Sequence, residues 1–116
     1  MQNITIILNH PSIGTEKAYN TLRYATALVE TGLRVNLFLM GDGVLAAKQG
    51  KNLPSGYPNV TDMLTNLMDN GVDVSACATC CGARGFVQED LLPGVEIANM
   101  QDLARLTKES DSVVVF

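Results

Sequence analysis

The stretch NITIILNHP, residues 3–11, sets the fold of this chain. Residues 3–8 are a β-branched, mostly apolar run, and the run ends in the loop-forming residues Asn9, His10 and Pro11. A short run of this kind, without the strict alternation of a half-exposed strand, is typical of a strand covered on both faces. The stretch therefore predicts a buried strand in a mainly parallel sheet.

The same strand signal returns along the chain, with helical patterns in between. We expect further strands at residues 35–40, 72–76, 95–98 and 112–116. The helices between them are expected to be capped by Thr15, by Asn59 or Thr61, and by Asn99. This alternation predicts a single α/β domain over residues 1–116, a three-layer α/β/α sandwich around a five-stranded, mainly parallel sheet.

The composition narrows the classes of function. The 116 residues carry a net charge of −4 and contain no cluster of Lys or Arg, so the basic patch of a nucleic-acid-binding protein is missing. No segment approaches the ~20 apolar residues of a membrane helix, and the N-terminus lacks the basic start of a signal peptide. We therefore expect a cytoplasmic protein without a nucleic-acid or membrane partner.

All three cysteines lie within five positions, in the stretch VDVSACATCCGARG, residues 72–85. Such a cluster cannot staple a fold, and in a reducing compartment it indicates chemistry or metal binding. Cys77 is expected directly after the third strand, with Cys80 and Cys81 near the start of a short helix. Helix N-terminal N–H groups, and the charge of Arg84 nearby, favour a thiolate, so we expect a lowered pKa and a nucleophilic sulfur.

Several roles for these thiols remain open on the residues alone. Cys77 and Cys80 form a CxxC pair, the spacing of dithiol oxidoreductases, although those motifs usually follow the first strand of their fold. The three cysteines with His10 make four zinc ligands on paper, but adjacent cysteines rarely bind one ion and a second CxxC is missing. Buried cysteines in a ligand- or partner-binding module are the third option. We expect reactive thiols, with no metal and no cofactor.

Other polar residues follow strands and therefore face the same edge of the sheet as the cysteines. His10 follows the first strand, where it could act as a base or be a solvated loop residue. Gly41, Asp42 and Gly43 follow the second strand and could line a ligand pocket, although the dinucleotide fingerprint GxGxxG is absent. A long loop up to residue 58 could cover this edge. His10 and the three turn residues are thus candidate binding residues.

The closing stretch SVVVF, residues 112–116, is expected to be a buried strand or an oligomer contact. An exposed sheet edge of this composition would promote aggregation, so something should cover it.

The stretch CATCCGARG, residues 77–85, resembles the cysteine motif of the DsrE/DsrF-like sulfur-relay family, which includes the DsrEFH and YchN-like proteins. Three other stretches agree with that family: GTEKAYNTLRYATALVETG (14–32), VNLFLMGDGV (35–44) and NMQDLARLTKESDSVVVF (99–116). The resemblance covers almost the whole chain, in the right order.

The resemblance implies a DsrEFH-like sandwich that assembles as a homotrimer or hexamer. In family members of known activity, a cysteine after the third strand carries a persulfide and passes its sulfur to a partner. Cys77 occupies that position, Cys80 matches a second cysteine of many DsrE-like members, and Cys81 has no counterpart. The implied function is a persulfide carrier, a sulfurtransferase or sulfur-relay subunit with donor and acceptor proteins as partners, in which Arg84 would stabilise anionic sulfur.

Overall fold

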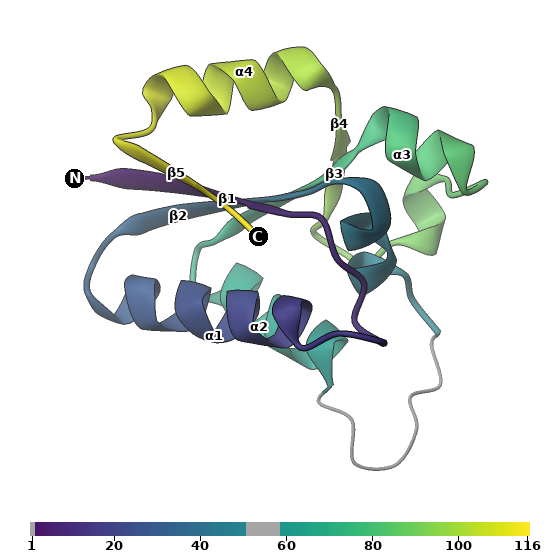
Figure 1. Ribbon diagram of the computed structural model, residues 1–116, viewed down its shortest axis with the longest axis horizontal. Helices are drawn as coiled ribbons and strands as arrows, with labels where there is room; N and C mark the ends of the chain where they lie inside the picture. Colours follow the sequence, from purple (N-terminus) through teal and green to yellow (C-terminus); the bar gives the residue numbers. More distant parts are fainter. Residues whose placement is uncertain (1, 51–58) are drawn as a thin grey trace.

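The computed structural model describes residues 2–50 and 59–116 (Figure 1). The elements in chain order are β1 (Asn3–Leu8), α1 (Lys17–Glu30), β2 (Arg34–Leu39), the 3-10 helix η1 (Gly41–Ala47), α2 (Val60–Asp69), β3 (Asp73–Cys77), α3 (Ala78–Ala83), the 3-10 helix η2 (Gln88–Asp90), β4 (Glu96–Ala98), α4 (Met100–Glu109) and β5 (Ser112–Val115). Each of the five strands begins and ends within one residue of its predicted bounds. The predicted loop up to residue 58 lies largely outside the described residues.

The five strands form one sheet in the order β4-β3-β2-β1-β5, and every neighbouring pair is parallel. Helices α1 and α2 cover one face of the sheet and α4 covers the other (Figure 1). This is the predicted three-layer α/β/α sandwich. Because all the strands run the same way, their carboxyl ends meet at one edge, where α3 and the loops after the strands gather.

The face under α1 and α2 is almost entirely apolar. Ile6 of β1 and Leu37 of β2 are fully buried there, together with Leu22 of α1 and Leu64 of α2. Burial of each such side chain stabilises the fold by about 1.5–3 kcal/mol relative to exposure. This layer explains why the central strands read as apolar runs in the sequence.

The face under α4 contains the polar residues of the central strands. Thr5 of β1 is fully buried, and its hydroxyl lies 2.6 Å from the hydroxyl of Ser110, just after α4. The amide of Asn36 in β2 donates a hydrogen bond of 3.5 Å to the same Thr5 oxygen. Buried polar groups must be paired in this way, because an unpaired group costs roughly 1–3 kcal/mol.

The helix caps follow the predicted chemistry at two of three positions. Asn59 and Asn99 accept hydrogen bonds from the N–H groups three residues ahead, and α4 has a complete capping box of Asn99 with Asp102. Helix α1 differs, because Glu16 occupies the cap position. Thr15 lies one residue earlier, and its hydroxyl accepts the N–H of Lys17 at 2.9 Å.

The prediction of a buried C-terminal strand is wrong for this chain taken alone. Strand β5 lies at an edge of the sheet and pairs only with β1. Val113 is 38% exposed and Val115 is 63% exposed. The sequence of β5 is as apolar as that of a buried strand, but the strand order leaves one side of β5 without a neighbouring strand. An apolar edge of this kind is a site where another strand can add.

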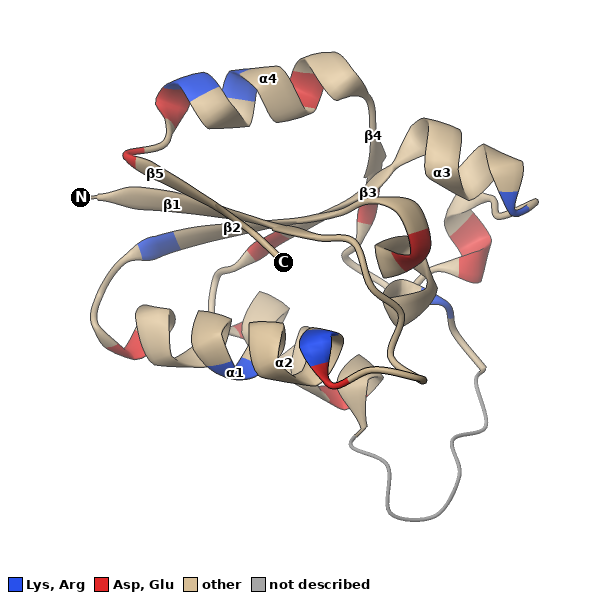
Figure 2. Ribbon diagram, in the orientation of Figure 1, with Lys and Arg blue, Asp and Glu red and all other residues tan. Residues whose placement is uncertain are grey.

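Figure 2 shows Lys and Arg together with Asp and Glu along α1 and α4. Within the described residues, no helix is long and apolar enough to cross a membrane.

Candidate functional site

The candidate site is built where β2 and β3 end side by side. In the parallel register, Leu39 of β2 pairs with Ala76 of β3, so the residues that follow both strands emerge next to each other. Cys77 is the last residue of β3 and the N-cap of α3. The turn that begins at Gly41 follows β2. Strand pairing alone therefore brings the glycine-rich turn against the cysteine helix, as the sequence predicted for this edge.

Both glycines of the turn are required by its geometry. Gly41 has φ +57°, a left-handed backbone conformation that residues other than glycine seldom adopt. Gly43 packs directly on the end of β1, where a Cβ would overlap the carbonyl oxygen of Leu8. The peptide N–H of Gly41 donates a hydrogen bond of 3.1 Å to the Sγ of Cys80. The turn thus contacts the cysteine helix itself.

Arg84 ties the two segments together from the end of α3. Its guanidinium donates a hydrogen bond of 2.7 Å to Oδ1 of Asp42 and one of 3.0 Å to the carbonyl oxygen of Cys80. The hydrogen bond to Asp42 raises the pKa of Arg84 above its usual value. One side chain therefore holds both the turn and the backbone of Cys80.

The three thiols have different surroundings. Cys77 is 4% exposed and Cys81 is 1% exposed, whereas Cys80 is partly exposed. All three are free, with no disulfide. Only Cys80 thus combines access to solvent with a backbone N–H from another element.

For the two buried thiols, the pKa is shifted upward and not downward as expected from the sequence. Burial raises the pKa of Cys77, and this effect exceeds the lowering by the N–H groups of Cys80 and Thr79. Burial also raises the pKa of Cys81, followed by repulsion from the other two sulfurs, and the charge of Arg84 offsets this only in part. A buried thiolate loses its hydration, which the first turn of a six-residue helix does not replace.

His10 lies at the same edge but apart from the cysteines. Its strand, β1, is separated from β3 by β2, which corresponds to about 10 Å at the usual strand spacing. Among the described residues, no hydrogen bond or ion pair joins His10 to the cysteine helix. The same part of the chain contains no group of three metal-ligating side chains arranged around an ion. The three-cysteine and His10 arrangement considered for zinc is therefore not assembled.

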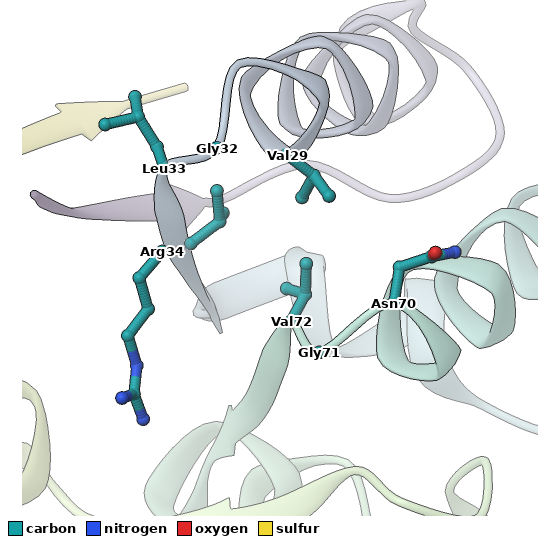
Figure 3. A pocket seen from close by; sticks show the side chains of 8 residues that line it. Val29, Gly32, Leu33, Arg34, Asn70, Gly71 and Val72 are labelled. Carbon is teal, nitrogen blue, oxygen red and sulfur yellow. The ribbon is translucent and has the colours of Figure 1, made fainter. Parts of the chain in front are cut away.

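A hollow of about 320 Å³ lies at the opposite, amino edge of the sheet. It opens between the C-terminal ends of α1 and α2, and its lining includes Val29, Leu33, Arg34, Asn70 and Val72 (Figure 3). Neither the cysteines nor the glycine-rich turn contributes to it.

The sequence identified the side chains of this site but not how they are connected. The pairing of Asp42 with Arg84 joins residues 42 positions apart, and no local pattern predicts it. The N–H of Gly41 was missed altogether, because a backbone donor has no signature in the sequence. The glycine itself gave one indirect signal, because glycine after a strand often adopts a positive φ in a tight turn.

Comparison with known proteins agrees with this fold. The model of the DsrE/DsrF-like family matches residues 2–116. The protein MJ0989 of Methanocaldococcus jannaschii is 46% identical over 113 residues, covering 97% of each chain. YchN of Escherichia coli is 40% identical over 118 residues, covering 100% of each chain, and its crystal structure matches with a TM-score of 0.93.

A more distant relative has a name that states an activity. The sulfurtransferase TusD of Serratia proteamaculans is 25% identical over 130 residues, covering 100% of each chain. The match of the family model over residues 2–116, with the fold of YchN, establishes the family. The chain belongs to the DsrE/DsrF-like family.

Proposed function

We propose that the protein is a sulfur-relay subunit that carries sulfur as a persulfide on Cys77. The observation that carries this proposal is the position of Cys77, the final residue of β3 and the N-cap residue of α3. Family membership and the relative named as a sulfurtransferase support it. The reducing cytoplasm, where free thiols persist, is the compartment that suits this chemistry.

The proposed reaction moves one sulfur atom without net oxidation. The Cys77 thiolate attacks the outer sulfur of a donor persulfide, the donor leaves as a thiolate, and Cys77 becomes Cys–S–SH. An acceptor thiolate then attacks that outer sulfur and restores the Cys77 thiolate. The rates of both exchanges depend on the thiolate fraction and on access to the sulfur.

A dithiol redox role is the second candidate, because Cys77 and Cys80 form a CxxC pair at the start of α3 and both are free thiols. That role requires Cys77 and Cys80 to form a disulfide when an oxidant removes two electrons and two protons. A binding module is the third candidate, since two of the three thiols are buried.

One mass measurement separates the three candidates. The reduced protein is exposed to glutathione persulfide, and its intact mass is read under non-reducing conditions, with proteolytic mapping of the modified residue. The relay predicts a gain of one sulfur that comes to rest on Cys77, and no gain in a Cys77→Ser/Cys80→Ser double variant that retains Cys81. A loss of two hydrogens favours the redox dithiol, and an unchanged mass favours the binding module.

We also propose that the chain works as a homo-oligomer. The exposed apolar edge of β5 supports this, because Val113 and Val115 would otherwise face water on a strand whose outer side has no neighbouring strand. Donor and acceptor proteins would then meet the carboxyl edge of the sheet, which contains the cysteines, while β5 contacts a second copy.

A further inference from the structure

The thiol that would store the sulfur is poorly placed to receive it. Cys77 is 4% exposed, and burial raises its pKa above the usual value for a thiol. A protein-bound persulfide must reach the attacking sulfur, and the thiolate is the reacting form. Direct loading of Cys77 by a donor protein therefore faces a steric barrier.

Cys80 differs from Cys77 in its exposure and in its hydrogen bond. Its side chain is partly exposed, and its Sγ accepts the N–H of Gly41 at 3.1 Å. This hydrogen bond keeps the Cys80 sulfur at the glycine-rich turn, on the side of the site that is open to solvent. The donor belongs to the turn after β2, and it is present independently of the short helix α3.

The contact between Gly41 and Cys80 is held by side chains on both sides. Arg84 donates to the carbonyl oxygen of Cys80 and to Oδ1 of Asp42, which follows Gly41 directly. The close packing of Gly43 on Leu8 fixes the other end of the turn. The Sγ of Cys80 is thus kept against a fixed N–H donor, within reach of the Cys77 side chain.

From this geometry we infer that Cys80 is the entry thiol, which takes sulfur from the donor and hands it to Cys77. This inference rests on the proposed persulfide relay and assigns the first step to a different residue. The Gly41 N–H and the Asp42–Arg84 bridge are positioning groups for that step.

The two steps balance in atoms and charge. The Cys80 thiolate attacks the outer sulfur of the donor persulfide, forming Cys80–S–SH and releasing the donor as a thiolate. The Cys77 thiolate then attacks that same outer sulfur, forming Cys77–S–SH and restoring the Cys80 thiolate. The Gly41 N–H lies against the Cys80 sulfur that leaves as a thiolate in this second step. The sulfur ends in the buried position, away from solvent reductants.

Two measurements test the inference, and the first needs no variant. At pH 7 the wild-type protein is treated with iodoacetamide, and the rates of alkylation of the three cysteines are mapped by peptide mass. Cys80 is expected to react at least tenfold faster than Cys77. Faster labelling of Cys77 overturns the inference.

The second measurement follows sulfur uptake from glutathione persulfide over time. Cys80→Ser is expected to load Cys77 at least tenfold more slowly than the wild type, and Cys77→Ser is expected to keep the fast uptake, with the sulfur held on Cys80. Cys81→Ala is the matched control and should load like the wild type. The folding of each variant is checked by circular dichroism.

The possible failures are distinguishable. Uptake at the wild-type rate in Cys80→Ser contradicts the entry role alone and leaves the relay through Cys77 in place. Fast alkylation of Cys80 together with no sulfur uptake by the wild type contradicts the proposed function, and the entry role with it.

Discussion

Replacing Gly43 by alanine should destabilise the protein strongly. The added Cβ would overlap the carbonyl oxygen of Leu8, an atom of the backbone of β1. Neither side of this contact can rotate away, because Leu8 is fully buried in the central sheet and Gly43 is buried in η1. Overpacking typically costs about 1–3 kcal/mol, and a clash between two backbone segments belongs at or above the upper end of that range.

A second glycine provides the matched control. Gly82 lies in α3, its backbone has an ordinary φ, and a Cβ there would meet no atom within 4 Å. Replacing a helical glycine by alanine in open space should stabilise the fold by roughly 0.5–1 kcal/mol. Two substitutions of identical chemistry should therefore change stability in opposite directions.

Urea denaturation at pH 7 under reducing conditions measures both effects. Gly43→Ala should lower the free energy of unfolding by about 3 kcal/mol or more, while Gly82→Ala raises or preserves it. A free energy of unfolding for Gly43→Ala within about 0.5 kcal/mol of the wild type, the size of a neutral surface change, would refute the close approach of the turn to β1. The same variant should also slow the reaction of Cys80 with iodoacetamide, because the turn supplies its N–H donor.

Three further outcomes are expected. Val115→Lys, on the open edge of β5, should reduce the oligomer size in sedimentation velocity. Val87→Lys changes a similarly exposed valine outside the strands and should leave the oligomer size unchanged. Equal behaviour of the two variants would show that β5 is not part of the interface. Because burial keeps Cys81 protonated in the fold, the stability of the protein should fall as the pH rises above the usual thiol pKa of 9.0. In thermal unfolding, Cys81→Ala should therefore lose less stability between pH 7 and 10 than the wild type. An identical loss in the two proteins would contradict the raised pKa. Asn99→Ala should cost about 1 kcal/mol by breaking the capping box of α4, with Gln101→Ala as a neutral control in urea denaturation, and no loss would argue against the cap.

The fold was predictable because its signals are local. The runs at residues 3–8 and 35–40 indicate buried strands in the sequence. In the structure, the apolar sides of helices cover one face of these strands, and paired polar groups such as Thr5 and Asn36 lie on the other. The asparagine cap at residue 99 likewise requires only its own neighbours. Strand order is not local, and for that reason the sequence predicted the strand at residues 112–116 but left open whether it is buried in the sheet or exposed at an edge.

The candidate site was predictable to the level of residue type and sheet edge. Cys77 ends β3, Cys80 and Arg84 follow it, and the rule that parallel strands end at one edge places them together with the turn after β2. The same rule also placed His10 there, but it does not say which strand ends are neighbours. The strand order β3-β2-β1 separates His10 from the cysteines, and only the structure provides that order.

The sequence presents Cys77 and Cys80 as similar thiols, and the fold makes them different. The helix N-terminus expected to activate Cys77 is present, but desolvation outweighs it. The N–H of Gly41 donates its hydrogen bond to Cys80 and not to Cys77. Two neighbouring thiols with unequal burial and unequal hydrogen bonding are suited to exchange in one direction, from the accessible sulfur that a donor can reach to the buried sulfur that is protected from solvent. A relay needs this inequality, since two equivalent thiols would share the sulfur without a preferred direction.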